Sequence, residues 1–99
     1  METGQSSKPY EFKYARGNVT MPCELNFEFQ NYRAKVTAIF RLDQMKIRGI
    51  TPTGLEDQTC SFTTSNRNRE RIKNSAKRCA YNLGWDMLQE LRSDGKVRF

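Results

Sequence analysis

Alternating apolar and polar residues dominate the first half of the chain, and this period of two is typical of half-buried β-strands. A first run covers residues 10–14 and is interrupted at residues 16–18, where a connection begins that Pro22 closes. The clearest strand covers residues 23–30, and residues 34–42 follow after a tight turn as its hairpin partner. The pattern therefore predicts three consecutive antiparallel strands.

The pattern is less regular after the predicted hairpin. Residues 45–48 predict a short basic strand, and residues 59–63 predict another brief strand. Between them, residues 49–57 contain Pro52 and Gly54 and predict a loop. The predicted sheet therefore has three to five strands.

A different period begins after Ser65 and Asn66, which are favourable helix-capping residues. Apolar side chains then recur at steps of three and four residues to about Arg92, and residues 93–95 end the pattern. The apolar positions are Ile72, Ala76, Cys79, Ala80, Leu83, Met87 and Leu91. A sheet followed by one long amphipathic helix predicts an α+β fold, in which the antiparallel sheet packs on the C-terminal helix.

The length of 99 residues suits a single domain. We expect residues 1–8 to be a disordered lead-in, residues 9–93 to form the domain, and residues 94–99 to be a tail. No apolar run approaches the length of a membrane span, so we expect no membrane partner.

The residue types argue against catalysis. The chain has no histidine, which removes the commonest general base and the imidazole metal ligand. Its carboxylates are scattered, and it has no glycine-rich phosphate loop. Cys23, Cys60 and Cys79 are isolated in apolar contexts, so we interpret them as reduced core thiols of an intracellular protein, nuclear or cytoplasmic. We therefore expect no enzyme, no catalytic residue, no metal, no cofactor and no small-molecule substrate.

The net charge of +6 is concentrated in one stretch. Residues 67–78 carry six basic side chains and one acid, Glu70, so this stretch alone has a net charge of +5. The six basic residues are Arg67, Arg69, Arg71, Lys73, Lys77 and Arg78. They fall at the start of the predicted helix, where the positive end of the helix dipole adds to their charge. This concentration favours a polyanionic partner, most simply a phosphate backbone, and the alternative is a solvated polar surface without a partner.

The segment Lys73-Asn74-Ser75-Ala76-Lys77-Arg78-Cys79-Ala80 resembles the K-K-x-A-K-x-x-A signature at the start of the second helix of double-stranded-RNA-binding domains. Residues 9–12 and 16–22 resemble the first strand and first connecting loop of that family. We expect no segment before Tyr10 to supply the family's first helix, so the chain resembles a divergent or incomplete member.

The resemblance implies a partner and a set of contacts. The partner is double-stranded or structured RNA, with Lys73 and Lys77 as phosphate ligands and Arg69 or Arg71 as a third contact. The loop implied to enter a minor groove contains Gly17, Asn18 and Thr20.

Two further hypotheses remain open. On a helical wheel centred on Ile72, Tyr81, Trp85 and Leu88 lie opposite the core stripe and predict an exposed apolar strip, the Tyr81–Trp85–Leu88 strip. Either other parts of the chain cover this strip, or it is the interaction face for a protein partner or a homodimer with weak or no RNA binding. Gly84, beside the strip, would permit close approach of another backbone.

The remaining hypothesis is a phospholipid or peptide binder similar to pleckstrin-homology domains, whose basic ligands would lie in strand loops rather than on the helix.

Overall fold

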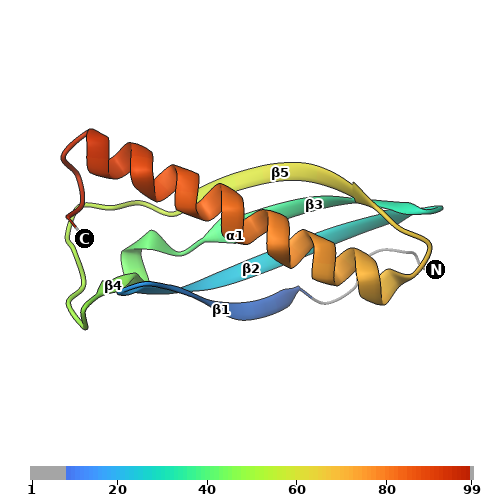
Figure 1. Ribbon diagram of the computed structural model, residues 1–99, viewed down its shortest axis with the longest axis horizontal. Coiled ribbons are helices and arrows are strands. Elements are labelled where there is room, and N and C mark those ends of the chain that lie inside the picture. The colour runs from blue at the N-terminus through green and yellow to red at the C-terminus, as the bar shows by residue number, and fades with distance from the viewer. Residues whose placement is uncertain (1–8, 99) are drawn as a thin grey trace.

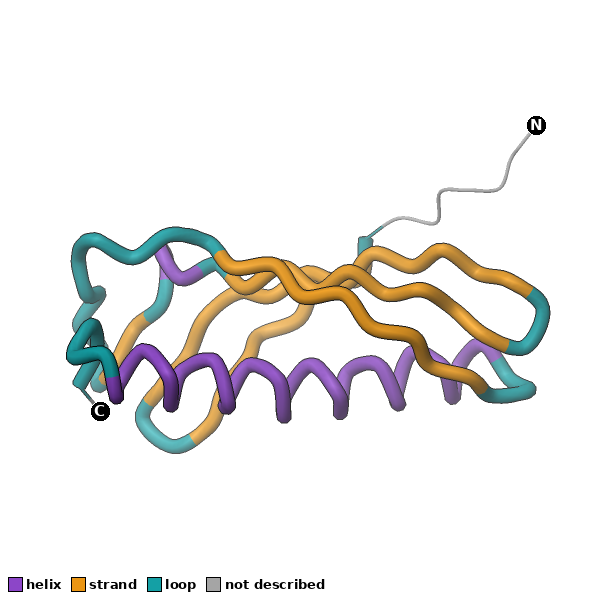
Figure 2. The backbone as a smooth tube through the Cα atoms, turned by 90° about the horizontal axis from the view of Figure 1, so that it is seen from above, coloured by secondary structure: helices purple, strands orange, loops and turns teal. Residues whose placement is uncertain are grey.

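The computed structural model describes residues 9–98, which form an antiparallel β-sheet with one long helix across one of its faces (Figure 1, Figure 2). The elements in chain order are β1 (Tyr10–Arg16), β2 (Val19–Gln30), β3 (Arg33–Phe40), a short 3₁₀ helix (Leu42–Gln44), β4 (Lys46–Ile47), β5 (Gln58–Ser65) and α1 (Arg69–Ser93). This arrangement confirms the predicted α+β fold, with five strands in the sheet. The predicted lead-in, residues 1–8, lies outside the described residues.

The strand order decides which turns lie beside the start of the helix. Strands neighbour one another in the order β1-β2-β3-β5, all antiparallel, and the short β4 pairs with the beginning of β2. Because each strand reverses the chain, β5 runs back toward the β2–β3 turn, and α1 begins at that end (Figure 1). The β1–β2 turn lies at the opposite end of a molecule that is 44 Å long.

The sheet has one buried and one open face, which explains the alternation in the sequence. In β2, the central strand, Met21, Cys23 and Leu25 face α1 and are buried. The other face, called the open face here, carries polar side chains such as Glu24 and Lys35. Within residues 9–98, no helix covers this open face (Figure 2).

The buried stripe of α1 turns steadily along the helix. The buried residues follow one another at steps of four: Ile72, Ala76, Ala80, Gly84 and Leu88. A step of four residues turns the helix about 40° beyond a full turn, so the stripe rotates by about 160° over these four steps. This rotation allows α1 to keep contact with the sheet while crossing it diagonally, because the sheet is twisted (Figure 1).

The predicted position of the Tyr81–Trp85–Leu88 strip was therefore wrong. A helical wheel assumes that the core lies in the same direction along the whole helix, and it therefore places the strip in solvent. In the structure, Leu88 is fully buried, and Tyr81 and Trp85 are half-buried against the core. The Tyr81 hydroxyl donates to the carbonyl oxygen of Lys13 at 3.3 Å, and the Arg16 guanidinium lies 4.5 Å from the Trp85 ring centroid. The chain's own β1 therefore contacts the strip, which agrees with the first of the two alternatives and not with an exposed interaction face.

Gly84 approaches aromatic rings of the chain's own core. A Cβ atom at this position would lie 2.9 Å from Cε1 of Phe40 and 3.1 Å from Cε2 of Tyr14. The two rings meet edge to face, and the Tyr14 hydroxyl donates to the carbonyl oxygen of Tyr81 at 3.1 Å. The missing side chain lets α1 lie close to β1 and β3, so the expected approach of a foreign backbone is not needed to explain this glycine.

Pro22 lies inside β2 rather than at the end of a connection, which corrects the predicted start of this strand. Its carbonyl oxygen accepts a hydrogen bond from the backbone N–H of Arg41, just beyond the end of β3. In a strand, the nitrogen and carbonyl of one residue point to the same side. The N–H that proline lacks would therefore face the side where β3 has already ended, so no ladder bond is lost.

Both ends of the helical region differ from the prediction by a few residues. The helix cap is Asn68, whose side-chain oxygen accepts the backbone N–H of Glu70 at 2.8 Å, rather than Ser65 or Asn66. After the helix, Val97 is buried in the core. The packed domain therefore extends beyond residue 93, into the segment predicted as a tail.

All three cysteines are free thiols, as predicted. Cys23 is buried, and burial raises the pKa of its thiol to about 12. Cys60 is half-buried, and burial raises its pKa as well.

Candidate nucleic-acid interface

The six predicted basic residues lie at the start of α1 and in the connection before it, and they are called the basic cluster here. Its members are Arg67, Arg69, Arg71, Lys73, Lys77 and Arg78. All are exposed except Lys77, which is half-buried. Within residues 9–98, no carboxylate forms an ion pair with any of them. Their charge is therefore available to an external anion.

Three members of the cluster form a row on one flank of the helix, called the basic row. Arg69, Lys73 and Lys77 follow one another at steps of four residues, about 6 Å apart along the helix axis. The Arg69 guanidinium lies 4.7 Å from the ring centroid of Phe29, and the Lys77 ammonium lies 5.6 Å from that of Phe12. These contacts rest both cations against the sheet's aromatic residues and orient the row.

The other helical members do not join this row. Arg71 and Arg78 are turned by about 160° and about 140° from the middle of the row, as the helical repeat requires, so they lie on the other side of α1. The cluster thus surrounds the start of the helix instead of forming one flat face. The basic row is the part that places several cations along a single direction.

A turn of the sheet lies next to the start of the helix. The backbone N–H of Asn66 donates to the carbonyl oxygen of Tyr32, in the β2–β3 turn, at 3.0 Å. The Tyr32 side chain is 70% exposed. A shallow pocket of about 400 Å³ is lined by Tyr32, Ser65, Asn66 and Arg67. The hydrophobic periodicity did not identify Tyr32 as a candidate site residue. The available signal was its position in a two-residue turn, where an aromatic ring does not belong to the buried face of a strand.

The residues expected in a minor-groove loop, Gly17, Asn18 and Thr20, do not join the basic cluster. The backbone carbonyl oxygen of Asn18 accepts the backbone N–H of Arg48 at 2.9 Å, and Thr20 pairs with Lys46 in β4. This β1–β2 turn lies near the Trp85 level of the helix, about 24 Å along the axis from Arg69, so the structure does not bring the two sets of predicted contacts together. The reason is β5, which adds one chain reversal before the helix and puts the β2–β3 turn beside its start.

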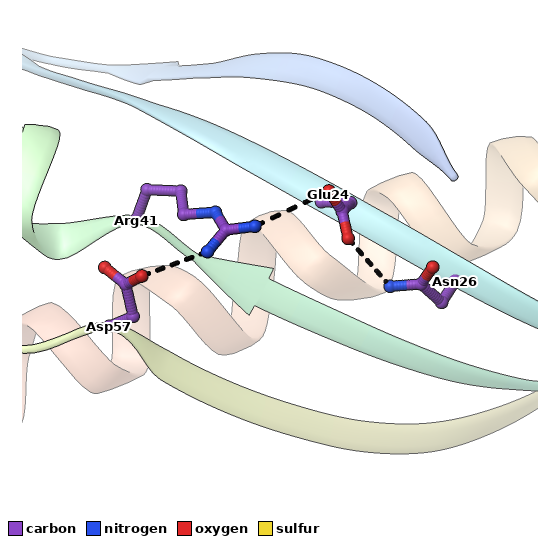
Figure 3. Close-up of polar contacts among 4 residues, drawn as sticks. All are labelled: Glu24, Asn26, Arg41 and Asp57. Carbon is purple, nitrogen blue, oxygen red and sulfur yellow. Dashed lines mark hydrogen bonds and ion pairs between the residues drawn. The ribbon is translucent and has the colours of Figure 1, made fainter. Parts of the chain in front are cut away.

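The open face offers a contrast, because its charges compensate one another. Arg41 contacts Asp57 at 3.1 Å and Glu24 at 3.6 Å, and the Asn26 amide donates to Glu24 at 3.0 Å (Figure 3). The hydrogen bond with Asp57 raises the pKa of Arg41. A hollow of about 840 Å³ on this side has both acids and bases in its lining, among them Glu11. Positive charge is therefore not concentrated here as it is around α1.

Comparisons with known proteins give no relative: no family model, no curated protein and no solved structure matches the chain. Across residues 9–98, no helix combines the length and the apolar character needed to cross a membrane.

Proposed function

We propose that this chain is an RNA-binding domain that contacts the phosphate backbone of double-stranded or structured RNA through the first half of α1. The observation that carries the proposal is the basic row of Arg69, Lys73 and Lys77. These cations lie at the surface, in line, and no acid among residues 9–98 neutralises them by an ion pair. Such a row matches a linear polyanion better than a single small anion.

The resemblance of residues 73–80 to the second helix of double-stranded-RNA-binding domains supports RNA as the polyanion. In that family, basic residues at this point of the helix contact phosphates across a major groove. Lys73 and Lys77 are both in the basic row, so the resemblance and the geometry favour the same two ligands.

Phosphate binding of this kind has a measurable dependence on salt. Each neutralised phosphate contributes roughly −0.9 to the slope of log K against log salt concentration. For the three cations of the row, the affinity should fall about 40-fold between 50 and 200 mM salt. Removing two of them should reduce the slope by about 2.

The test is a titration of fluorescent duplex RNA, single-stranded RNA and duplex DNA at these two salt concentrations. The variants are K73A/K77A and the control K35A/K46A, which removes the same charge from the open face. We expect K73A/K77A to lose most duplex RNA binding and the control to keep it. Equal losses in the two variants, equally weak binding of all three nucleic acids, or no binding would each contradict the proposal.

A further inference from the structure

We infer that Tyr32 is a stacking platform for an unpaired nucleobase of the RNA that the basic row holds. The inference rests on the proposed function and narrows its ligand to RNA with single-stranded nucleotides next to a duplex. The juxtaposition that supports it is an exposed aromatic ring, a shallow pocket and arginine side chains at one end of the molecule.

Tyr32 is presented to solvent by an anchored turn. Its side chain is 70% exposed, although its ring is large and mostly apolar. The pairing of Gln30 with Arg33 closes the turn on one side, and the hydrogen bond from Asn66 fastens it to the start of the helical segment. An aromatic ring held on fixed backbone loses little conformational freedom on binding, so it suits stacking with a flat partner.

The pocket beside the ring offers polar groups. The side-chain oxygen of Asn66 accepts the backbone N–H of Arg67 at 2.8 Å, which fixes the plane of the carboxamide. The amide nitrogen of Asn66 has no hydrogen-bond partner in the part of the chain that the structure describes, so it can donate to the edge of a base. Arg67, on the same pocket, supplies a charge for the adjacent phosphate.

Charge selects a nucleotide over an apolar peptide at this end. Residues 30–33 and 65–69 include three arginines and no acid. A ligand that combines a flat ring with a phosphate meets both features, as single-stranded RNA does when aromatic side chains stack its bases and cations hold its backbone.

The base that stacks on Tyr32 must be unpaired and must lie beyond the end of a duplex. Bases inside a duplex stack on each other and are not available to a protein ring. The basic row begins at Arg69 and runs along α1 away from the β2–β3 turn (Figure 1). A duplex lying along the row would therefore place nucleotides beyond its end over Tyr32.

The experiment compares a blunt RNA duplex with the same duplex carrying three unpaired nucleotides at its 3′ or 5′ end. The proteins are the unmodified chain, Tyr32→Ala, Tyr32→Trp, and Ile50→Ala, which removes the other highly exposed large apolar side chain among residues 9–98. We expect one overhang to raise affinity by about 5- to 150-fold, Tyr32→Ala to abolish this gain, and Tyr32→Trp and Ile50→Ala to keep it.

The outcomes separate this inference from the proposed function. If the unmodified chain binds blunt and overhanging duplexes equally, or Tyr32→Ala keeps the gain, the stacking role is wrong. The phosphate contacts would still stand in that case, provided K73A/K77A weakens binding to the blunt duplex. If neither duplex binds to any of these proteins, the inference and the proposed function both fail.

Discussion

Replacing Gly84 with alanine is expected to destabilise the protein, although alanine favours helices and glycine does not. Gly84 lies in the middle of α1 on its buried stripe. In an exposed helix, the same substitution would stabilise by about 1 kcal/mol. The outcome therefore depends on whether the core can accept one methyl group at this point.

The distances indicate that it cannot do so freely. The new Cβ would lie 2.9 Å from a Phe40 ring atom and 3.1 Å from a Tyr14 ring atom, so at least one ring must move. Both rings are fully buried, and the Tyr14 hydroxyl donates a hydrogen bond to the carbonyl oxygen of Tyr81. Overpacking of this kind costs about 1–3 kcal/mol, which outweighs the helix gain and gives a net loss of about 1 kcal/mol.

The assay is denaturant unfolding followed by circular dichroism, with Asn82→Ala as the matched control. Asn82 is exposed on the same helix, so its substitution should stabilise by about 0.5 kcal/mol through propensity alone. If Gly84→Ala also stabilises by about 1 kcal/mol, the close packing of α1 on β1 and β3 is refuted.

Three other predictions concern the scaffold. Asn68→Ala removes the cap on the N–H of Glu70 and should cost about 1 kcal/mol in unfolding free energy, whereas Asn68→Asp should retain most of the stability. Tyr14→Phe removes the hydrogen bond that the Tyr14 hydroxyl donates to the carbonyl oxygen of Tyr81 and should cost about 1 kcal/mol in the same assay; no loss would contradict that hydrogen bond. Burial raises the pKa of the Cys23 thiol from 9.0 to about 12, so the neutral thiol makes its full contribution to the free energy of unfolding below pH 9. Its contribution should be lost between pH 9 and 12, by about 1.4 kcal/mol per pH unit, and Cys23→Ala should show a shallower decline in unfolding free energy over that range.

The strands and the helix were predictable because each buries only one face. β2 and β3 alternate between the core and the open face, and this simple geometry leaves a period of two in the sequence. The rotation of the helix stripe was not predictable, because it depends on the twist of the sheet beneath α1. Tyr81 and Trp85 therefore appeared to face solvent on a wheel, although they pack on β1.

For the candidate site, the cations were predictable and their neighbours were not. The charge of residues 67–78 is a local property of the sequence. The turn that lies beside them depends on how many times the chain reverses before the helix. The sequence predicts only a brief strand at residues 59–63. Because β5 is a full strand that reverses the chain once more, the β2–β3 turn with Tyr32 lies beside the start of α1, and the β1–β2 turn with Gly17 does not.

The most direct test of RNA binding through the start of α1 is an NMR titration of the ¹⁵N-labelled chain with duplex RNA. We expect amide signals of residues 66–78 to shift first and most, with saturation at one site, and these shifts to weaken as salt is raised. Signals of the open face, such as those of Lys35 and Lys46, should stay in place. Shifts that centre on the open face, or that spread evenly over the chain, would contradict the account.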